Sequence, residues 1–132
     1  MDELLKTSDI ITLHVPLTKE TVGLIGEKEF SMMKDGVIFV NTSRAQVVDK
    51  KAFLRALNDG KFGGVAVDVF ENEPTVDREL VDTEFDNFIV TPHIGAQTVE
   101  TKERIGARLI KLVRRFKENQ EGVASIKNSL EN

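Results

Sequence analysis

Cysteine is absent from this 132-residue sequence, and so is any apolar run long enough to cross a membrane. Without cysteine, the chain can form neither a disulfide framework nor a thiolate metal site. The start of the chain also lacks the apolar core of a signal peptide. These absences predict a cytoplasmic protein with no metal site and no membrane partner.

An excess of positive charge is lacking too. The 18 basic residues are outnumbered by 22 acidic ones, which gives a formal net charge of −4, and both signs are interspersed. Arg114 and Arg115 are only a pair inside an expected helix, so we expect no nucleic acid partner. An apolar content of 40% and a charged content of 30% are typical of a soluble globular protein of one domain.

A third absence concerns nucleotide binding. No G-x-G-x-x-G sequence follows any apolar run, and residues 60–64 (GKFGG) lack that spacing and precede an expected strand instead of a helix. By itself, the chain therefore lacks the usual loop that binds a pyrophosphate at the start of a helix.

Four short apolar runs predict strands, at residues 10–15, 37–40, 64–67 and 88–90. Helical patterns alternate with them, and Asp49 is placed to cap one of the helices. This alternation predicts an α/β fold with a small parallel sheet of four strands in sequential order. Crossovers in one direction put the connecting helices on one face, so we expect a bare second face and an open edge at the first strand.

A long C-terminal helix is expected over residues 98–118. Its apolar residues recur at helical spacing, at Ile105, Leu109, Leu112 and Phe116. We expect this stripe to pack on the bare face of the sheet, unless two chains associate to cover that face. Residues 119–132 are expected to form a loosely ordered tail.

Polar residues follow three of the apolar runs. Arg44 follows the second run, Glu73 lies beyond the third, and His93 follows the fourth. The carboxyl ends of parallel strands meet at one edge of a sheet, where α/β proteins gather ligand groups. A cation, a carboxylate and a titratable base that meet there suit redox or acid–base chemistry on a small acidic substrate.

Each of these residues has a simpler interpretation when taken alone. A lone histidine is more often structural, and Glu73 by itself would be an ordinary surface charge. Together, the carboxylate would fix the tautomer of the imidazole and favour its charged form. Arg44 requires a carboxylate, which either the protein or a substrate could supply. Asp68 stands inside an apolar run and needs donors, from an amide ligand or a helix N-terminus.

Four segments, in this order, carry a resemblance to a known family: residues 14–18 (HVPLT), 41–44 (NTSR), 66–74 (AVDVFENEP) and 91–96 (TPHIGA). They are similar to the sequential motifs of the NAD-dependent D-isomer-specific 2-hydroxyacid dehydrogenases, over about residues 2–116. The last segment is similar to the phosphoglycerate dehydrogenase branch. The resemblance implies half of a Rossmann-type doubly wound fold, in which residues 1–118 are the second half of the NAD-binding domain with its terminal helix.

The resemblance also implies roles for individual residues. Arg44 would hold the substrate carboxylate and carbonyl, His93 would exchange the hydroxyl proton, and Glu73 would pair with His93. In the intact enzyme, hydride would pass between a small 2-hydroxy or 2-keto acid and NAD. The residues expected to line the cofactor are Val15, Thr42, Ser43, Arg44, Asp68, His93, Ile94, Gly95 and Ala96.

The sequence departs from the family in two ways. Ala45 stands where members carry glycine after the arginine, which would strain the backbone if that position requires a positive φ. The family's substrate domain and glycine-rich loop would precede Met1. We therefore expect a fragment that is inactive on its own and that binds NAD weakly or not at all.

Two other functions stay open on the sequence alone. The chain could be a catalytically idle autonomous half-domain, or a folding and evolution model. It could instead be a non-enzymatic interaction protein, like the transcriptional corepressors that share this fold with its Arg, Glu and His. We also expect a homodimer, joined near the first strand or through exchanged C-terminal helices.

Overall fold

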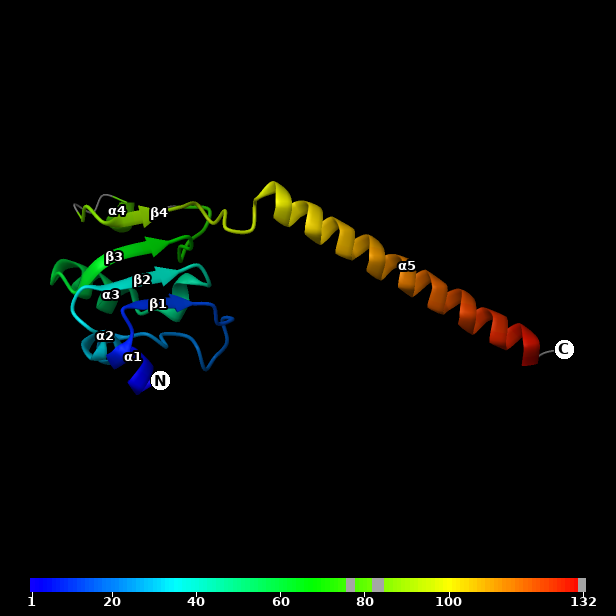
Figure 1. The fold of residues 1–132 in the computed structure, drawn as a ribbon, viewed down its shortest axis with the longest axis horizontal. Helices are drawn as coiled ribbons and strands as arrows, with labels where there is room; N and C mark the ends of the chain where they lie inside the picture. Colours follow the sequence, from blue (N-terminus) through cyan, green and yellow to red (C-terminus); the bar gives the residue numbers. More distant parts are fainter. Residues whose placement is uncertain (76–77, 82–84, 131–132) are drawn as a thin grey trace. The chain divides into compact units, whose positions relative to one another are not determined.

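The computed structural model describes the backbone of residues 1–75, 78–81 and 85–130, and the side chains of these residues except Glu79 and 120–130. The chain divides into two compact units, Met1–Gly95 and Ala96–Asn132. The first unit holds the sheet and the shorter helices, and the second holds one long helix (Figure 1). Within the described part of the chain, no helix is both long and apolar enough to cross a membrane.

The sheet has four strands, all parallel, in the order β1-β2-β3-β4. Its strands are β1 (Ile10–Leu13), β2 (Val37–Asn41), β3 (Phe62–Val67) and β4 (Phe88–Val90). Figure 1 shows the four arrows running in the same direction, with β1 at one edge and β4 at the other. The predicted number, direction and order of strands are therefore confirmed.

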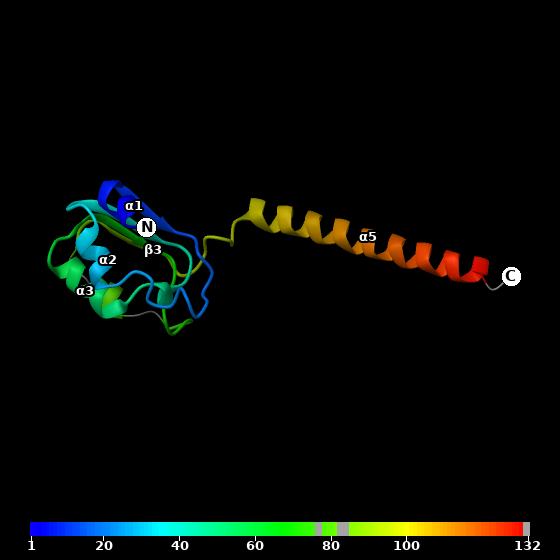
Figure 2. The same cartoon turned by 90° about the horizontal axis from the view of Figure 1, so that it is seen from below.

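Helices precede β1 and connect the strands. They are α1 (Asp2–Thr7), α2 (Glu27–Met32), the short 3-10 helix η1 (Ala45–Val47), α3 (Lys50–Asn58) and α4 (Arg78–Val81). The expected cap of α3 is confirmed, because Asp49 Oδ1 accepts a hydrogen bond of 2.8 Å from the backbone N–H of Ala52. Figure 2 shows α2 and α3 together on one side of the sheet, as crossovers in a single direction require.

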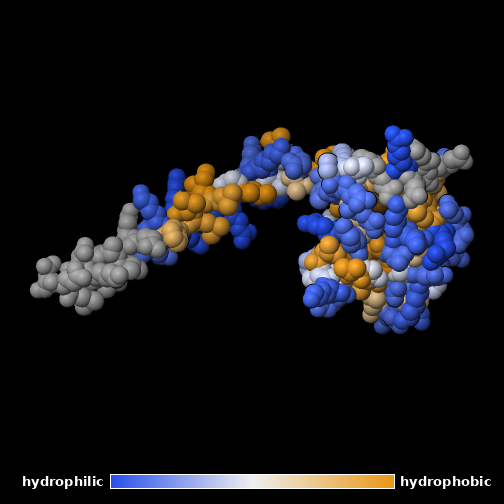
Figure 3. All heavy atoms as spheres, turned by 180° about the vertical axis from the view of Figure 1, so that it is seen from behind, coloured by the Kyte–Doolittle hydropathy of each residue, from blue (hydrophilic) through white to orange (hydrophobic). Residues whose placement is uncertain are grey.

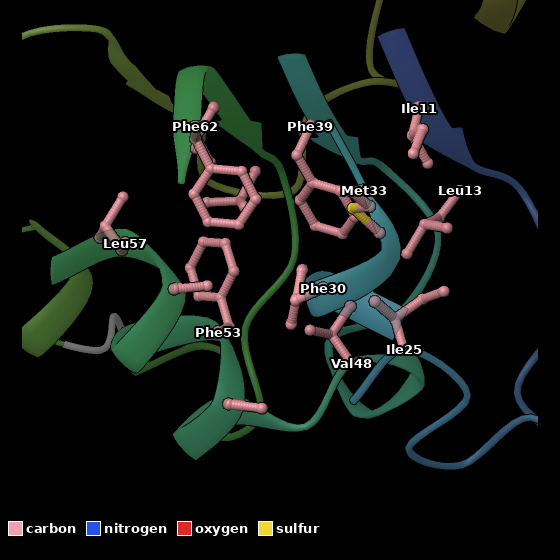
Figure 4. Packing of buried hydrophobic residues seen from close by; sticks show 14 of the residues in the cluster. Ile11, Leu13, Ile25, Phe30, Met33, Phe39, Val48, Phe53, Leu57 and Phe62 are labelled. Atoms are coloured by element: carbon pink, nitrogen blue, oxygen red, sulfur yellow. The ribbon is translucent and has the colours of Figure 1, made fainter. Parts of the chain in front are cut away.

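The core of the first unit lies on the side of the sheet that α2 and α3 cover. Its centre is a cluster of four phenylalanine rings, which come from both helices and both central strands (Figure 4). Phe39 is 0% exposed, and its ring centroid lies 5.4 Å from that of Phe30, in an edge-to-face arrangement. Phe53 and Phe62 pack beside it, with their ring centroids 5.6 Å apart. These contacts join the helices to the sheet.

The opposite face of the sheet is bare within this unit. Side chains of each strand alternate between the two faces, so the residues beside the buried ones point the other way. Ile10, Ile38 and Ile89 on that face are 61%, 42% and 65% exposed. Ile10 and Ile38 are register partners across β1 and β2, so they form a continuous apolar surface. The expectation of a bare second face is confirmed.

The second unit is the helix α5, Val99–Leu130. It continues past residue 118, so the backbone of 119–130 is helical where we expected a loosely ordered tail. No proline interrupts this stretch, which allows the helix to continue. Ile105, Leu109, Leu112 and Phe116 are each more than half exposed, and Figure 3 shows hydrophobic side chains along this helix. The expected packing of the stripe on the sheet stays a prediction. A single helix offers these side chains no second layer within its own unit.

Candidate active site

The ends of all four strands lie level at one edge of the sheet. Leu13 is the register partner of Asn41, Asn41 of Val67, and Val67 of Val90, and each of these residues is the last of its strand. The segments that carry the candidate residues therefore leave the sheet side by side. This row is the carboxyl edge, where α/β sheets place their ligand groups.

A buried asparagine organises the end of β2. The side-chain oxygen of Asn41 accepts hydrogen bonds of 3.0 Å from both the backbone N–H and the hydroxyl of Ser43. Its amide nitrogen donates to the backbone carbonyl of Arg44 at 3.1 Å. Asn41 thus fixes the turn from which Arg44 leaves the sheet. We did not predict this role for Asn41, although a polar residue at the end of a buried strand is a signal for it in the sequence.

Arg44 is exposed at this edge. Its Nη1 donates a hydrogen bond of 2.7 Å to the carbonyl of Ser43, and among the described residues no carboxylate forms an ion pair with it. The guanidinium therefore keeps donors for an external carboxylate, one of the two partners that we had considered. Ala45 begins η1 without a positive φ, so the strain considered for that position does not arise.

Glu73 and His93 form the central pair of the site. Glu73 Oε2 lies 2.6 Å from His93 Nδ1, while Glu73 Oε1 accepts a hydrogen bond of 3.0 Å from the backbone N–H of Phe70. The hydrogen bond from Phe70, and next that from His93, hold the pKa of Glu73 below its ordinary value of 4.5. The positive charge of Arg44 acts in the same direction.

This geometry assigns the proton on the imidazole. An ionised carboxylate only accepts hydrogen bonds, so the hydrogen between the two groups belongs to His93 Nδ1. The side chains of His93 and Glu73 are 41% and 36% exposed, so the pair is open to solvent. Nε2 is then the ring nitrogen that can exchange a proton with a bound molecule. The expected pairing of the two residues is present in the structure.

The backbone of His93 is unusual. Its φ is 54°, the one positive value among the described residues other than glycine. Its N–H donates to the carbonyl of Thr91 at 3.0 Å, which closes a tight turn directly after β4. A left-handed histidine is uncommon and requires surroundings that hold it. Nothing in the sequence pattern predicted this conformation.

Asp68 directly follows β3 at the same edge of the sheet, but it is only 5% exposed. Its Oδ1 accepts from the hydroxyl of Thr91 and from the backbone N–H of Ile94 at 2.9 Å, and its Oδ2 accepts from the N–H of Gly95 at 2.8 Å. Burial alone would raise the pKa of Asp68, but these three hydrogen bonds outweigh it and hold the pKa below its ordinary 3.8. The donors are backbone and hydroxyl groups, not the amide ligand or helix N-terminus that we expected.

The other residues expected to line a cofactor differ in accessibility. Val15 is partly buried, and Thr42 and Ile94 are exposed at the same edge. Ser43 is buried, and its hydroxyl is bonded to Asn41. Ala96 belongs to the second unit and has no described position at this edge. Within the described residues, no group of three or more His, Cys, Asp or Glu side chains is placed to hold a metal ion.

The chain is similar to known proteins over most of its length. Residues 1–95 match the model of the D-isomer specific 2-hydroxyacid dehydrogenase NAD binding domain. The chain is 50% identical over 102 residues to a glyoxylate reductase of Thermococcus litoralis, covering 77% of this chain and 30% of that protein. It is 49% identical over 106 residues to a D-3-phosphoglycerate dehydrogenase of Archaeoglobus fulgidus, covering 80% of this chain and 20% of that protein.

A solved structure shows the same similarity in three dimensions. The D-lactate dehydrogenase of Aquifex aeolicus, complexed with NAD and lactic acid, matches with a TM-score of 0.74 and 42% identity. The match covers 89% of this chain and 40% of that one. The chain spans between 20% and 38% of the length of the curated relatives that it matches.

Proposed function

Because the chain belongs to the D-isomer specific 2-hydroxyacid dehydrogenases, we propose that its sheet edge carries the catalytic residues of such an enzyme. The reaction would move hydride between a small 2-hydroxy or 2-keto acid and NAD. The observation that supports this proposal is the His93–Glu73 pair, with a distance of 2.6 Å, at the same edge as the exposed Arg44. These residues supply a proton-exchanging group and a cation for a carboxylate.

Arg44 would bind the substrate. Its planar guanidinium can hold a carboxylate through two parallel hydrogen bonds, and Asn41 fixes the backbone from which it extends. The names of the relatives include several small acids, among them glyoxylate, 3-phosphoglycerate and lactate. The proposal for this chain therefore stays at the level of a 2-hydroxy or 2-keto acid.

His93 would exchange the proton of the substrate hydroxyl through Nε2. Glu73 keeps the other nitrogen, Nδ1, protonated and orients the ring, while the Phe70 N–H holds Glu73 in place. A bound NAD would accept or supply the hydride. Glu73 is a positioning residue in this proposal, because it acts through the imidazole.

The residues present fit one end of NAD better than the other. The carboxyl edge offers exposed polar groups at Thr42 and in residues 93–95, which would face the nicotinamide and its ribose. This sequence has no G-x-G-x-x-G loop for the pyrophosphate. We therefore propose that NAD is bound in the intact enzyme and weakly or not at all by this chain alone.

A chimera tests the proposal. The matched segment of the Thermococcus litoralis glyoxylate reductase is replaced by the corresponding part of this chain, and oxidation of NADH by glyoxylate is followed by absorbance. We expect turnover, and we expect His93→Ala to reduce it by about 10²–10⁴-fold. His14→Ala is the matched control, because His14 contacts Thr12 at 2.9 Å and has no role in the proposed reaction. A folded chimera that binds NADH without turnover would favour an interaction protein of the corepressor type.

Self-association forms a second part of the proposal. We propose a homodimer, since Ile10, Ile38 and Ile89 expose an apolar sheet face and β1 is an edge strand. Joining near β1 or through exchanged α5 helices would reduce the exposed apolar area. Sedimentation of dilute protein checks this, and a clean monomer with a soluble Leu109→Glu variant would contradict it. A cytoplasmic location stays a prediction from the sequence.

A further inference from the structure

Asp68 differs from Arg44, Glu73 and His93 in being buried. Arg44, Glu73 and His93 carry exposed groups, whereas Asp68 is 5% exposed and accepts three hydrogen bonds. All three donors belong to one short segment, residues 91–95, and they lie on both sides of His93 in the sequence. The carboxylate therefore bridges the two ends of the turn that carries the imidazole.

We propose that Asp68 is a positioning residue for His93, a role that rests on the proposed function of the site. Its carboxylate clamps the turn of residues 91–95 and holds His93 in the left-handed conformation that directs the imidazole towards Glu73. This differs from the role that the resemblance implies, in which Asp68 lies by the nicotinamide.

The sheet places the two halves of this clamp together. Asp68 follows Val67, Thr91 follows Val90, and Val67 and Val90 are register partners in neighbouring parallel strands. Thr91 also donates its backbone N–H to the carbonyl of Val67 at 3.0 Å. The hydroxyl of Thr91 thus reaches Asp68 Oδ1 directly, and the chain then turns so that the N–H groups of Ile94 and Gly95 meet the same carboxylate.

The conformation of His93 is the reason that a clamp is needed. A φ of 54° is energetically unfavourable for a residue with a side chain. It persists only where contacts from the surroundings hold the backbone. Before His93, Thr91 is fixed by Asp68. After His93, the N–H groups of Ile94 and Gly95 are fixed by the same group. Release of either side would let the backbone relax to ordinary φ values and move the imidazole away from Glu73.

The absence of a side chain at Gly95 is part of the same arrangement. A Cβ atom at this position would lie 2.9 Å from Asp68 Oδ2, which is closer than real Cβ atoms approach. Glycine therefore permits the carboxylate to reach the N–H of Gly95, although the φ of Gly95 is not in the left-handed range. A side chain at position 95 would therefore force the Asp68 carboxylate to shift from its present position.

The test uses the 132-residue chain and nuclear magnetic resonance. In the wild type, we expect an Nδ1 resonance of His93 typical of a protonated nitrogen bonded to Glu73, detected through the carbon-bound ring protons, which do not exchange with solvent. Asp68→Asn removes the charge and one acceptor oxygen. It should abolish that resonance and speed hydrogen exchange at Ile94 and Gly95 by about tenfold or more. Exchange in β2 should be unchanged, which shows that the fold is intact.

Two further variants make the result specific. Gly95→Ala disturbs the clamp from its other side and should give the same loss of the His93 resonance. Asp49→Asn is the matched control, because it makes the same chemical change at a helix cap where asparagine serves equally well. It should leave the His93 resonance and residues 91–95 unchanged.

The outcomes separate this inference from the proposed function. An Asp68→Asn chain that keeps both the resonance and slow exchange at Ile94 and Gly95 would overturn the clamp. So would an Asp68→Asn change that keeps the turn but, in the chimera, weakens NADH binding by about tenfold or more, since Asp68 would then be a cofactor ligand. A chimera without turnover would overturn the proposed function. It would not affect the proposed clamp, which is tested by the His93 resonance and by hydrogen exchange and not by turnover.

Discussion

Replacement of Phe39 by alanine should destabilise the first unit more than any change on the opposite face of the sheet. Phe39 is fully buried, and its ring lies 5.4 Å from Phe30, 5.7 Å from Phe62 and 6.0 Å from Phe53, measured between centroids. Truncation of such a residue removes packing and leaves a cavity, which costs about 3–5 kcal/mol. For a unit of this size, the thermal midpoint should fall by roughly 12–40 °C.

The matched control is the next residue of the same strand. Ile38 points to the bare face and is 42% exposed, so Ile38→Ala loses little buried area. Its cost in a monomer should be no more than about 1 kcal/mol, which is the range of strand propensities. The two variants therefore truncate neighbouring residues of one strand on opposite faces of the sheet.

Urea unfolding followed by circular dichroism, at two protein concentrations, measures both effects. Phe39→Ala should lower the free energy of unfolding at each concentration. Ile38→Ala should cost more at the higher concentration only, because a dimer that covers the bare face adds stability by mass action. If Ile38→Ala were as costly as Phe39→Ala in dilute monomer, the one-sided core would be refuted.

Three further predictions concern the site. The isolated chain should show no dehydrogenase turnover and should bind NAD at best with a millimolar dissociation constant; calorimetry that gives a micromolar value would contradict this. In the chimera, Arg44→Lys should raise the KM for the 2-keto acid by about tenfold or more, because a point charge replaces a planar fork, and an unchanged KM would remove Arg44 from carboxylate binding. The stability that Asp68 contributes is complete above its ordinary pKa of 3.8 and is lost as the pH falls through its lower pKa in the folded state. The difference in unfolding free energy between wild type and Asp68→Asn should therefore become smaller in acid. Acid-unfolding curves that stay parallel would contradict this prediction.

The strands could be predicted because their apolar runs are short and separated, but three boundaries differ. β1 ends at Leu13 where we expected residue 15, and β2 extends one residue further, to Asn41. We expected the third strand to begin at residue 64, whereas β3 begins at Phe62. The glycine pair that follows Phe62 has the appearance of a turn in the sequence. In the structure, a Cβ atom at Gly63 would lie 2.5 Å from the carbonyl oxygen of Gly36, so the glycine permits a close backbone approach inside the sheet.

The connection between β3 and β4 and the C-terminal helix show two other limits. No element was predicted between residues 73 and 87, but this stretch includes the single turn of α4, from which Leu80 joins the core. One buried residue in a polar stretch produces no periodic signal. For α5, the stripe predicted the helix correctly, but a stripe does not identify the surface that covers it.

The convergence of Arg44, Glu73 and His93 at one edge followed from topology, because parallel strands align their ends. The different roles of the two carboxylates, Asp68 and Glu73, did not follow from topology. Asp68 and Glu73 are five residues apart in the sequence and follow the same strand, and both act on the segment after β4. Asp68 is buried and bonds the backbone and a hydroxyl, whereas Glu73 is accessible and bonds the ring.

This division has a physical reason. A backbone held in an unfavourable conformation needs acceptors that are shielded from water, because an exposed carboxylate would bond to solvent instead. A carboxylate that assists proton exchange needs the opposite, since the imidazole must remain accessible to a substrate. One loop after β3 supplies both environments. Asp68 directly follows the strand and is buried, whereas residues 71–73 are exposed and the N–H of the buried Phe70 holds Glu73. The position of the imidazole therefore depends on β3 through two separate contacts, one to its backbone turn and one to its ring.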